Sequence, residues 1–199
     1  MSHPSFQGPP PISLLRGINE SVNCVSFTSG DSLIAGSING NLRLLSLNSG
    51  KVILCGRSHE SSVLSLIDLG NKMCSSSRDG KLKVWDLERE QFNQPMQTLD
   101  TGSMGFCNSS SDRKDPTSNI VVTPSFNDGE SLLWDLRTSA IASKYNVDVS
   151  CGMITSLLLC SQSNNRGYES ICDDSSTQQF VCMGSDDGSV SIFDVRVNR

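Results

Sequence analysis

The stretch SHESSVLSLIDLGNKMCSSSRDGKLKVWDL, from Ser58 to Leu87, sets a pattern that the rest of the chain repeats. Apolar and polar residues alternate through most of it, as in β-strands with one buried face. Arg78-Asp79-Gly80 marks a tight turn, because glycine accepts the positive φ that such turns need. We therefore predict strands at 62–67, 72–77 and 81–87, followed by a fourth near 96–99.

Three weaker copies of this unit accompany it. All four units have a turn glycine followed five residues later by a large apolar residue: Gly40 and Leu45, Gly80 and Trp85, Gly129 and Trp134, and Gly188 and Phe193. The extra length between copies is polar, as expected of loops inserted into stacked repeats. We predict repeats at 17–55, 58–99, 102–145 and 151–199, with polar insertions at 108–118 and 161–178.

The same alternation predicts strands in the other repeats. They lie at 21–27, 32–37, 41–47 and 51–55 in the first repeat, at 119–123, 131–135 and 140–145 in the third, and at 153–159, 180–185 and 189–195 in the fourth. The third repeat opens with a strand-like piece at 103–107, and we expect 108–118 to be an exposed loop and 161–178 to be mobile. Residues 1–10 are rich in Pro, Gly and Ser and are expected to be disordered, before a short strand at 12–15.

Composition and charge argue against several classes of function. The 199 residues carry a net charge of −5, whereas a phosphate-binding surface needs a basic face, so we expect no direct nucleic-acid partner. Eight cysteines form no C-x-x-C pair and the histidines number two, so we predict no metal site and no cofactor. The sequence shows no signal peptide and no membrane-length apolar run, so we expect reduced thiols, a nuclear or cytoplasmic location and no membrane partner.

Four polar residues of the second repeat are spaced so that they can meet across its strands: His59, Ser75, Asp79 and Trp85. Tryptophan donates one N–H, serine and neutral histidine both donate and accept, and the carboxylate accepts. The set resembles the structural tetrad of WD-repeat proteins, although Ser77 shares the face of Ser75. A Ser-His-Asp hydrolase is disfavoured, because no G-x-S-x-G elbow accompanies these residues, and we predict no enzyme.

The resemblance to WD-repeat proteins implies an all-β fold, a β-propeller in which each repeat forms one blade. Residues 11–199 would supply about four blades, whereas the usual number in WD proteins is about seven, so we predict an incomplete, truncated ring. The strand at 12–15 would then lack the blade to which it is donated. Leu133-Trp134-Asp135-Leu136-Arg137 also resembles the W-D-x-R box of substrate receptors for cullin-4 ubiquitin ligases, which implies partner binding by Trp134, Asp135 and Arg137.

Several short elements resemble one family, the G-protein beta-subunit-like protein 1 and ASTRA-associated protein 1 group. They are the Pro-rich start leading into Leu15-Arg16-Gly17, the stretch 58–87, SMGFCNSS at 103–110, Cys151-Gly152-Met153, and MGSDDGSVSIFDV at 183–195. The resemblance implies a non-enzymatic scaffold in a multiprotein complex, working with the ASTRA assembly, which is also linked to chromatin, and with the TTT co-chaperone complex. That machinery supports maturation of phosphatidylinositol-kinase-related kinases. The alternative is a cullin-4 substrate receptor.

Overall fold

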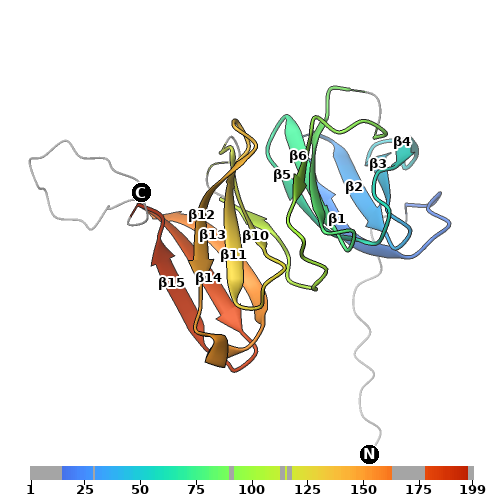
Figure 1. Ribbon diagram of the computed structural model, residues 1–199. Helices are drawn as coiled ribbons and strands as arrows, with labels where there is room; N and C mark the ends of the chain where they lie inside the picture. The colour runs from blue at the N-terminus through green and yellow to red at the C-terminus, as the bar shows by residue number, and fades with distance from the viewer. Residues whose placement is uncertain are drawn as a thin grey trace, which may run out of the picture.

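Four antiparallel β-sheets make up the described part of the chain (Figure 1). The computed structural model describes residues 15–28, 30–89, 92–112, 115, 118–162 and 178–196. The first sheet holds β1 (Val22–Phe27), β2 (Ser32–Ser37), β3 (Asn41–Ser46) and β4 (Val52–Arg57), and the second holds β5 (Val63–Asp68), β6 (Lys72–Ser77), β7 (Lys81–Asp86) and β8 (Gln97–Asp100). The third holds β9 (Ser110–Ser111), β10 (Ile120–Pro124), β11 (Glu130–Asp135) and β12 (Ala140–Asn146). After a 3-10 turn, η1 (Val149–Cys151), the fourth holds β13 (Ile154–Gln162), β14 (Gln178–Ser185) and β15 (Val190–Asp194).

Strands form where the sequence alternates. β2 and β6 have the predicted bounds, and the other predicted strands that form differ from the structure by at most three residues at an end. In β5 the side chains of Val63, Ser65 and Ile67 are buried and those between them are partly exposed, because successive residues of a strand point to opposite faces. No helix among the described residues is long and apolar enough to cross a membrane.

The turn glycines join each sheet to the next. All four have positive φ, between 75° and 89°: Gly40, Gly80, Gly129 and Gly188. The carbonyl of Gly40 accepts hydrogen bonds from the backbone N–H groups of Ser58 and His59, at 3.0 and 2.9 Å, where the chain enters the second sheet. The next two junctions repeat this contact, from Thr101 and Gly102 to Gly80 and from Val147 to Gly129. The glycine therefore turns the chain and also fixes how consecutive sheets meet.

Three apolar clusters fill the junctions between consecutive sheets. The cluster between the first and second sheets contains Ile34, Leu42, Val63, Met73, Trp85 and Phe92. That between the second and third contains Ile67, Leu69, Cys74, Leu82, Val84, Leu99, Val121, Leu132, Trp134 and Leu136. That between the third and fourth contains Val122, Leu133, Tyr145, Val147, Leu159, Val181, Met183 and Val195. Each sheet is thus stabilised by burial against its neighbours in the sequence.

The two terminal sheets keep one face open. Val25, Phe27 and Ile53 are exposed on the first sheet, and Val190 and Ile192 on the fourth. These sheets lie at opposite ends of the row in Figure 1, and no buried apolar cluster of the described residues joins them. Within the described part of the chain the sheets form an arc and not a closed ring.

Two predictions for the third repeat are wrong. Residues 103–107 form a loop instead of a strand, and the first strand of this sheet is the two-residue β9. The start of the 108–118 segment is buried and not exposed, because Ser111 pairs with Val121 and the Asp112 carboxylate accepts a hydrogen bond from the hydroxyl of Ser161. Polar groups are buried here because they bond one another.

Other predictions fall largely outside the described residues. Of the strand at 12–15, only Leu15 is described, and it is not in a strand. Of the insertion predicted to be mobile at 161–178, residues 163–177 are not described, whereas Ser161 and Gln162 belong to β13 and Gln178 belongs to β14. The sheet therefore extends further into this segment than the sequence predicted.

Candidate functional site

The four polar residues predicted in the second repeat meet in one chain of hydrogen bonds. His59 Nδ1 lies 2.9 Å from Asp79 Oδ2, and His59 Nε2 lies 2.7 Å from Ser75 Oγ. Trp85 Nε1 donates to the same serine oxygen over 2.8 Å. These residues come from the loop before β5, from β6, from the β6–β7 turn and from β7, so the hydrogen bonds fasten together most of one sheet.

Ser75, and not Ser77, completes this set. The hydroxyl of Ser77 donates to the carbonyl of Ser61 and accepts from the N–H of Asp79. Because tryptophan only donates, the consistent assignment has Ser75 donating to His59 Nε2 and His59 Nδ1–H donating to the carboxylate. Ser75 and His59 are buried, so the arrangement holds the sheet together and presents no nucleophile to solvent.

The carboxyl group of Asp79 is held in its ionised form. Burial raises its pKa, but the hydrogen bond from His59 and those from the N–H groups of Glu60 and Lys81 outweigh that effect. The pKa falls from the ordinary 3.8 to about 2. The stabilisation supplied by this carboxylate is therefore complete when the pH is above the pKa of Asp79 in the unfolded chain. It is lost as the pH falls through the pKa of Asp79 in the folded chain.

Replacement of Asp79 by asparagine should make the free energy of unfolding less dependent on pH in the acid range. In the unchanged chain, the contribution of Asp79 to the free energy of unfolding should decline between about pH 4 and pH 2, and the variant should lack that decline. Urea denaturation at a series of pH values measures it. The matched control is Asp128→Asn, an exposed carboxylate in the equivalent Asp-Gly turn, and parallel profiles for the two variants would contradict the assignment.

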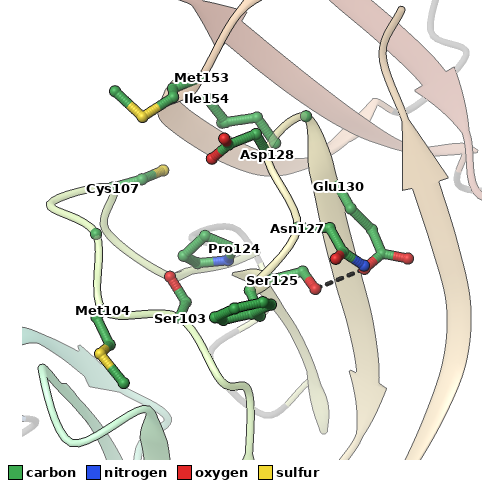
Figure 2. Close-up of a pocket in the computed structure, with 13 residues that line it drawn as sticks. Ser103, Met104, Cys107, Pro124, Ser125, Asn127, Asp128, Glu130, Met153 and Ile154 are labelled. Carbon is green, nitrogen blue, oxygen red and sulfur yellow. Dashed lines mark hydrogen bonds between the residues drawn. The ribbon is translucent and has the colours of Figure 1, made fainter. Parts of the chain in front are cut away.

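A different group of residues surrounds a cavity of about 280 Å³ at the junction of the third and fourth sheets (Figure 2). Ser103, Met104 and Cys107 lie on the loop before β9, across the hollow from Ser125 and Glu130 in Figure 2. The rest of the wall comes from the β10–β11 turn and from the loop that enters β13. Turns and loops of these two kinds form one edge of every sheet, which carries the turn glycines and is here called the glycine-turn face.

Large apolar side chains surround this cavity while remaining in solvent. Met104, Phe106, Phe126 and Met153 are 65, 78, 74 and 56% exposed, and we call these four residues the apolar rim. Cys107 also lines the cavity but is buried, and burial raises the pKa of its thiol to about 12, so it acts as a small apolar group. Clustered exposed apolar side chains mark surfaces that bind another molecule.

The apolar rim continues toward the first two sheets. The guanidinium of Arg78 lies 4.2 Å from the centroid of the Phe106 ring, a cation–π contact. Ile38, Ser62 and Arg78 line a second hollow of about 450 Å³ that also includes Phe106. The loop before β9 thus connects the two hollows, because Met104 lines the first and Phe106 lines the second.

Comparisons with known proteins agree with this architecture. The family "WD domain, G-beta repeat" matches residues 10–46 and 50–86. The chain therefore contains WD repeats. It is 29% identical over 202 residues to guanine nucleotide-binding protein subunit beta-like protein 1 of Mus musculus, covering 96% of this chain and 58% of that protein. It is also 30% identical over 97 residues, 48% of this chain, to F-box/WD repeat-containing protein sel-10 of Caenorhabditis elegans, of which 16% is covered.

Two solved structures share the fold. The computationally designed Ika4 protein matches with a TM-score of 0.66 and 20% identity, over 94% of this chain and 99% of that one. The designed Ika8 protein matches with a TM-score of 0.62 and 20% identity, over 90% of this chain and 48% of that one. With the WD repeats, these matches confirm the predicted fold class: the four sheets are blades of an incomplete WD-repeat propeller.

The other blades of this chain keep parts of the tetrad. In the third blade Trp134 Nε1 donates to the buried hydroxyl of Thr123 over 3.0 Å. In the fourth blade Phe193 occupies the tryptophan position and stacks at a tilt on Tyr145, with ring centroids 5.3 Å apart. Apolar packing therefore replaces the polar chain in the terminal blade.

The residues of the W-D-x-R box differ in their exposure to solvent. Trp134 is buried, whereas the Arg137 side chain is exposed and its guanidinium bonds both oxygens of Asp135, at 3.0 and 2.7 Å. This pair raises the pKa of Arg137 further above its ordinary value. The guanidinium thus has a partner within its own blade, and the comparisons do not favour the cullin-4 alternative.

The apolar rim was missed as a site by sequence reasoning. The sequence predicts a strand-like piece for the SMGFC element at 103–107, whereas the element forms a loop. A signal was present nonetheless: Gly105 separates two large apolar residues in a segment bounded by polar residues on both sides. Such a short apolar pair in a loop has no partner strand to cover it.

Proposed function

We propose that this WD-repeat chain is a non-enzymatic protein-interaction scaffold that binds its partner on the glycine-turn face. The observation that carries the proposal is the apolar rim, four large side chains that stand more than half exposed, three of them lining one cavity and Phe106 lining the neighbouring hollow. Aromatic and methionine side chains are enriched at protein interfaces, where they supply most of the binding energy. WD-repeat relatives support protein partners, not a small-molecule substrate.

We further propose that the partner is the ASTRA assembly or the TTT co-chaperone complex, and that the chain serves maturation of phosphatidylinositol-kinase-related kinases or a chromatin-associated assembly. The support is the identity with the beta-like protein 1 of mouse along nearly the whole chain. The chain spans 58% of that relative, so the partners of the longer protein are carried over here as a proposal. A nuclear or cytoplasmic location is proposed with it, and the seven described cysteines, all free, suit a reducing compartment.

The double variant Met104→Ser with Phe106→Ser tests both parts. We expect its affinity for purified TTT complex to fall at least about tenfold, since buried interface anchors each contribute on the order of 2 kcal/mol. Biolayer interferometry measures the affinity. The fold should be unaffected, because both side chains are exposed.

The control is Leu47→Ser, an exposed apolar residue at the β3–β4 turn on the opposite edge of the first blade. Equal affinity of the double variant and the unchanged chain would overturn the assignment of the face. Absence of any complex with the unchanged chain would overturn the choice of partner.

A further inference from the structure

We propose that the apolar cavity takes a short extended segment of the partner in which a large apolar side chain is flanked by lysine or arginine. This inference rests on the proposed function, because it names the chemistry that the same site selects. The cavity and its apolar rim supply the anchor site. The charges around it decide which segment fits.

Four segments around the cavity contribute side chains to the glycine-turn face. Apart from Cys107 and Cys151, their ionisable side chains are all acidic. The segments 101–109, 124–130, 147–153 and 185–189 contain no lysine and no arginine, and their carboxylates are Asp128, Glu130, Asp148, Asp186 and Asp187. A ligand anchored in the cavity must therefore lie beside negative charge. Charge complementarity of this kind steers the encounter and excludes acidic competitors.

Most of these carboxylates face solvent. Asp128 lines the cavity and is exposed, and Asp148 and Asp187 are exposed in the neighbouring loop and turn. Backbone and hydroxyl hydrogen bonds from Ser150 lower the pKa of Asp148, and the backbone N–H of Ser189 lowers the pKa of Asp187, so both stay ionised at neutral pH. These bonds leave the exposed sides of the carboxylates to a ligand.

Two of the acidic residues hold the site together. Asp186 Oδ1 accepts the N–H of Met153 over 3.1 Å, and the Asp186 N–H donates to the Met153 carbonyl, which fastens the β14–β15 turn to the cavity wall. Glu130 accepts from Ser125 and Asn127 and pairs with Lys144. They position the rim, and the other three carboxylates, of Asp128, Asp148 and Asp187, are the contacts for the ligand.

The opposite end of the rim carries the positive charge of Arg78, over Phe106. Glu60 is exposed in the loop beside the β6–β7 turn that carries Arg78, so the second blade presents both charges, whereas the third and fourth blades present carboxylates. A bound segment would therefore place its basic residues toward β14 and β15, away from Arg78.

The test uses labelled peptides and fluorescence anisotropy with the full chain. One short peptide has a central Leu-Phe pair flanked by Lys and Arg, and matched peptides have serine or glutamate in place of the basic residues. We expect the basic peptide to bind about tenfold more tightly than the serine peptide at low salt and to lose this advantage as salt rises. Equal affinity for the three peptides would overturn the proposal.

Two sets of variants separate this inference from the proposed function. Asp128→Asn, Asp148→Asn and Asp187→Asn combined keep the shapes of the side chains and should remove the preference for the basic peptide, whereas Asp31→Asn with Glu88→Gln at the opposite edge should not. If the Met104→Ser, Phe106→Ser variant binds none of the peptides while the aspartate variant still prefers the basic peptide, selection by charge is overturned and the scaffold function stands. If the serine pair has no effect on any peptide, the scaffold face itself is wrong.

Discussion

Replacement of Trp85 by alanine is expected to lower the free energy of unfolding by about 3–5 kcal/mol, the usual cost of emptying a buried tryptophan site. The side chain is 1% exposed and packs edge-on against Phe92, with ring centroids 5.9 Å apart. Its removal leaves a cavity between the first two blades and takes from Ser75 the hydrogen bond of the indole. Urea denaturation followed by circular dichroism measures the change.

The matched variant is Trp85→Phe, which keeps an aromatic ring and removes the N–H donor. It should cost about 1–3 kcal/mol, the penalty for a buried polar group that loses a partner. The fourth blade already carries phenylalanine at this position, so the ring is compatible with the fold. A loss below about 1 kcal/mol for Trp85→Ala would mean that neither the packing nor the tetrad stabilises this blade.

Gly40→Ala is expected to destabilise the chain by about 2–5 kcal/mol, from left-handed backbone strain together with a backbone clash. Gly40 has φ of 81°, and a Cβ there would lie 2.3 Å from the carbonyl oxygen of His59. That carbonyl belongs to the loop whose N–H groups bond the Gly40 carbonyl, so relief of the clash would break the junction between two blades. Thermal and urea unfolding measure the effect.

Gly188→Ala is the control that separates the two causes. Gly188 has φ of 89° in the equivalent turn of the fourth blade, but a Cβ there would meet nothing within 4 Å. Its cost should be the strain alone, about 1–2 kcal/mol. Equal losses at the two positions would show that the turn glycines matter for their φ only and do not join consecutive blades.

The order of strands and turns could be predicted because its causes are local. Alternation and the turn glycines act within a few residues, so 72–77 and 32–37 were placed with their observed bounds. The hydrogen-bond partners of Ser75 also lie in one repeat, and the donor and acceptor inventory of four side chains was enough to propose their contact. One choice stayed open, and the structure decides it in favour of Ser75 over Ser77.

The third blade and the apolar rim depended on contacts that the sequence does not reveal. The polar run at 108–118 predicts an exposed loop, but β9 pairs with β10 and its neighbour Asp112 accepts a hydrogen bond from Ser161 of the next blade. Exposure of Met104 and Phe106 results from the loop that carries them, which lies over the glycine-turn face without a covering strand. Because burial is decided by partners distant in the sequence, residue type alone does not predict the exposure of either segment.

The polar tetrad and the apolar rim of this chain therefore have different roles. The His-Ser-Asp-Trp chain lies within one blade, is closed to solvent and acts on stability. The apolar rim lies on the loops of the weaker third and fourth repeats and is open to a partner. Loss of the first should lower the free energy of unfolding, and loss of the second should leave a folded protein that binds its partner at least about tenfold more weakly.

Amide hydrogen exchange of the chain, alone and bound to purified TTT complex, tests the central claim most directly. We predict slower exchange on binding at 103–107, 125–129 and 152–154, the segments that carry the apolar rim, with no change at the opposite edge in 47–51 and 136–139. Protection confined to the opposite edge, or no protection on the glycine-turn face, would contradict the claim that this face binds the partner.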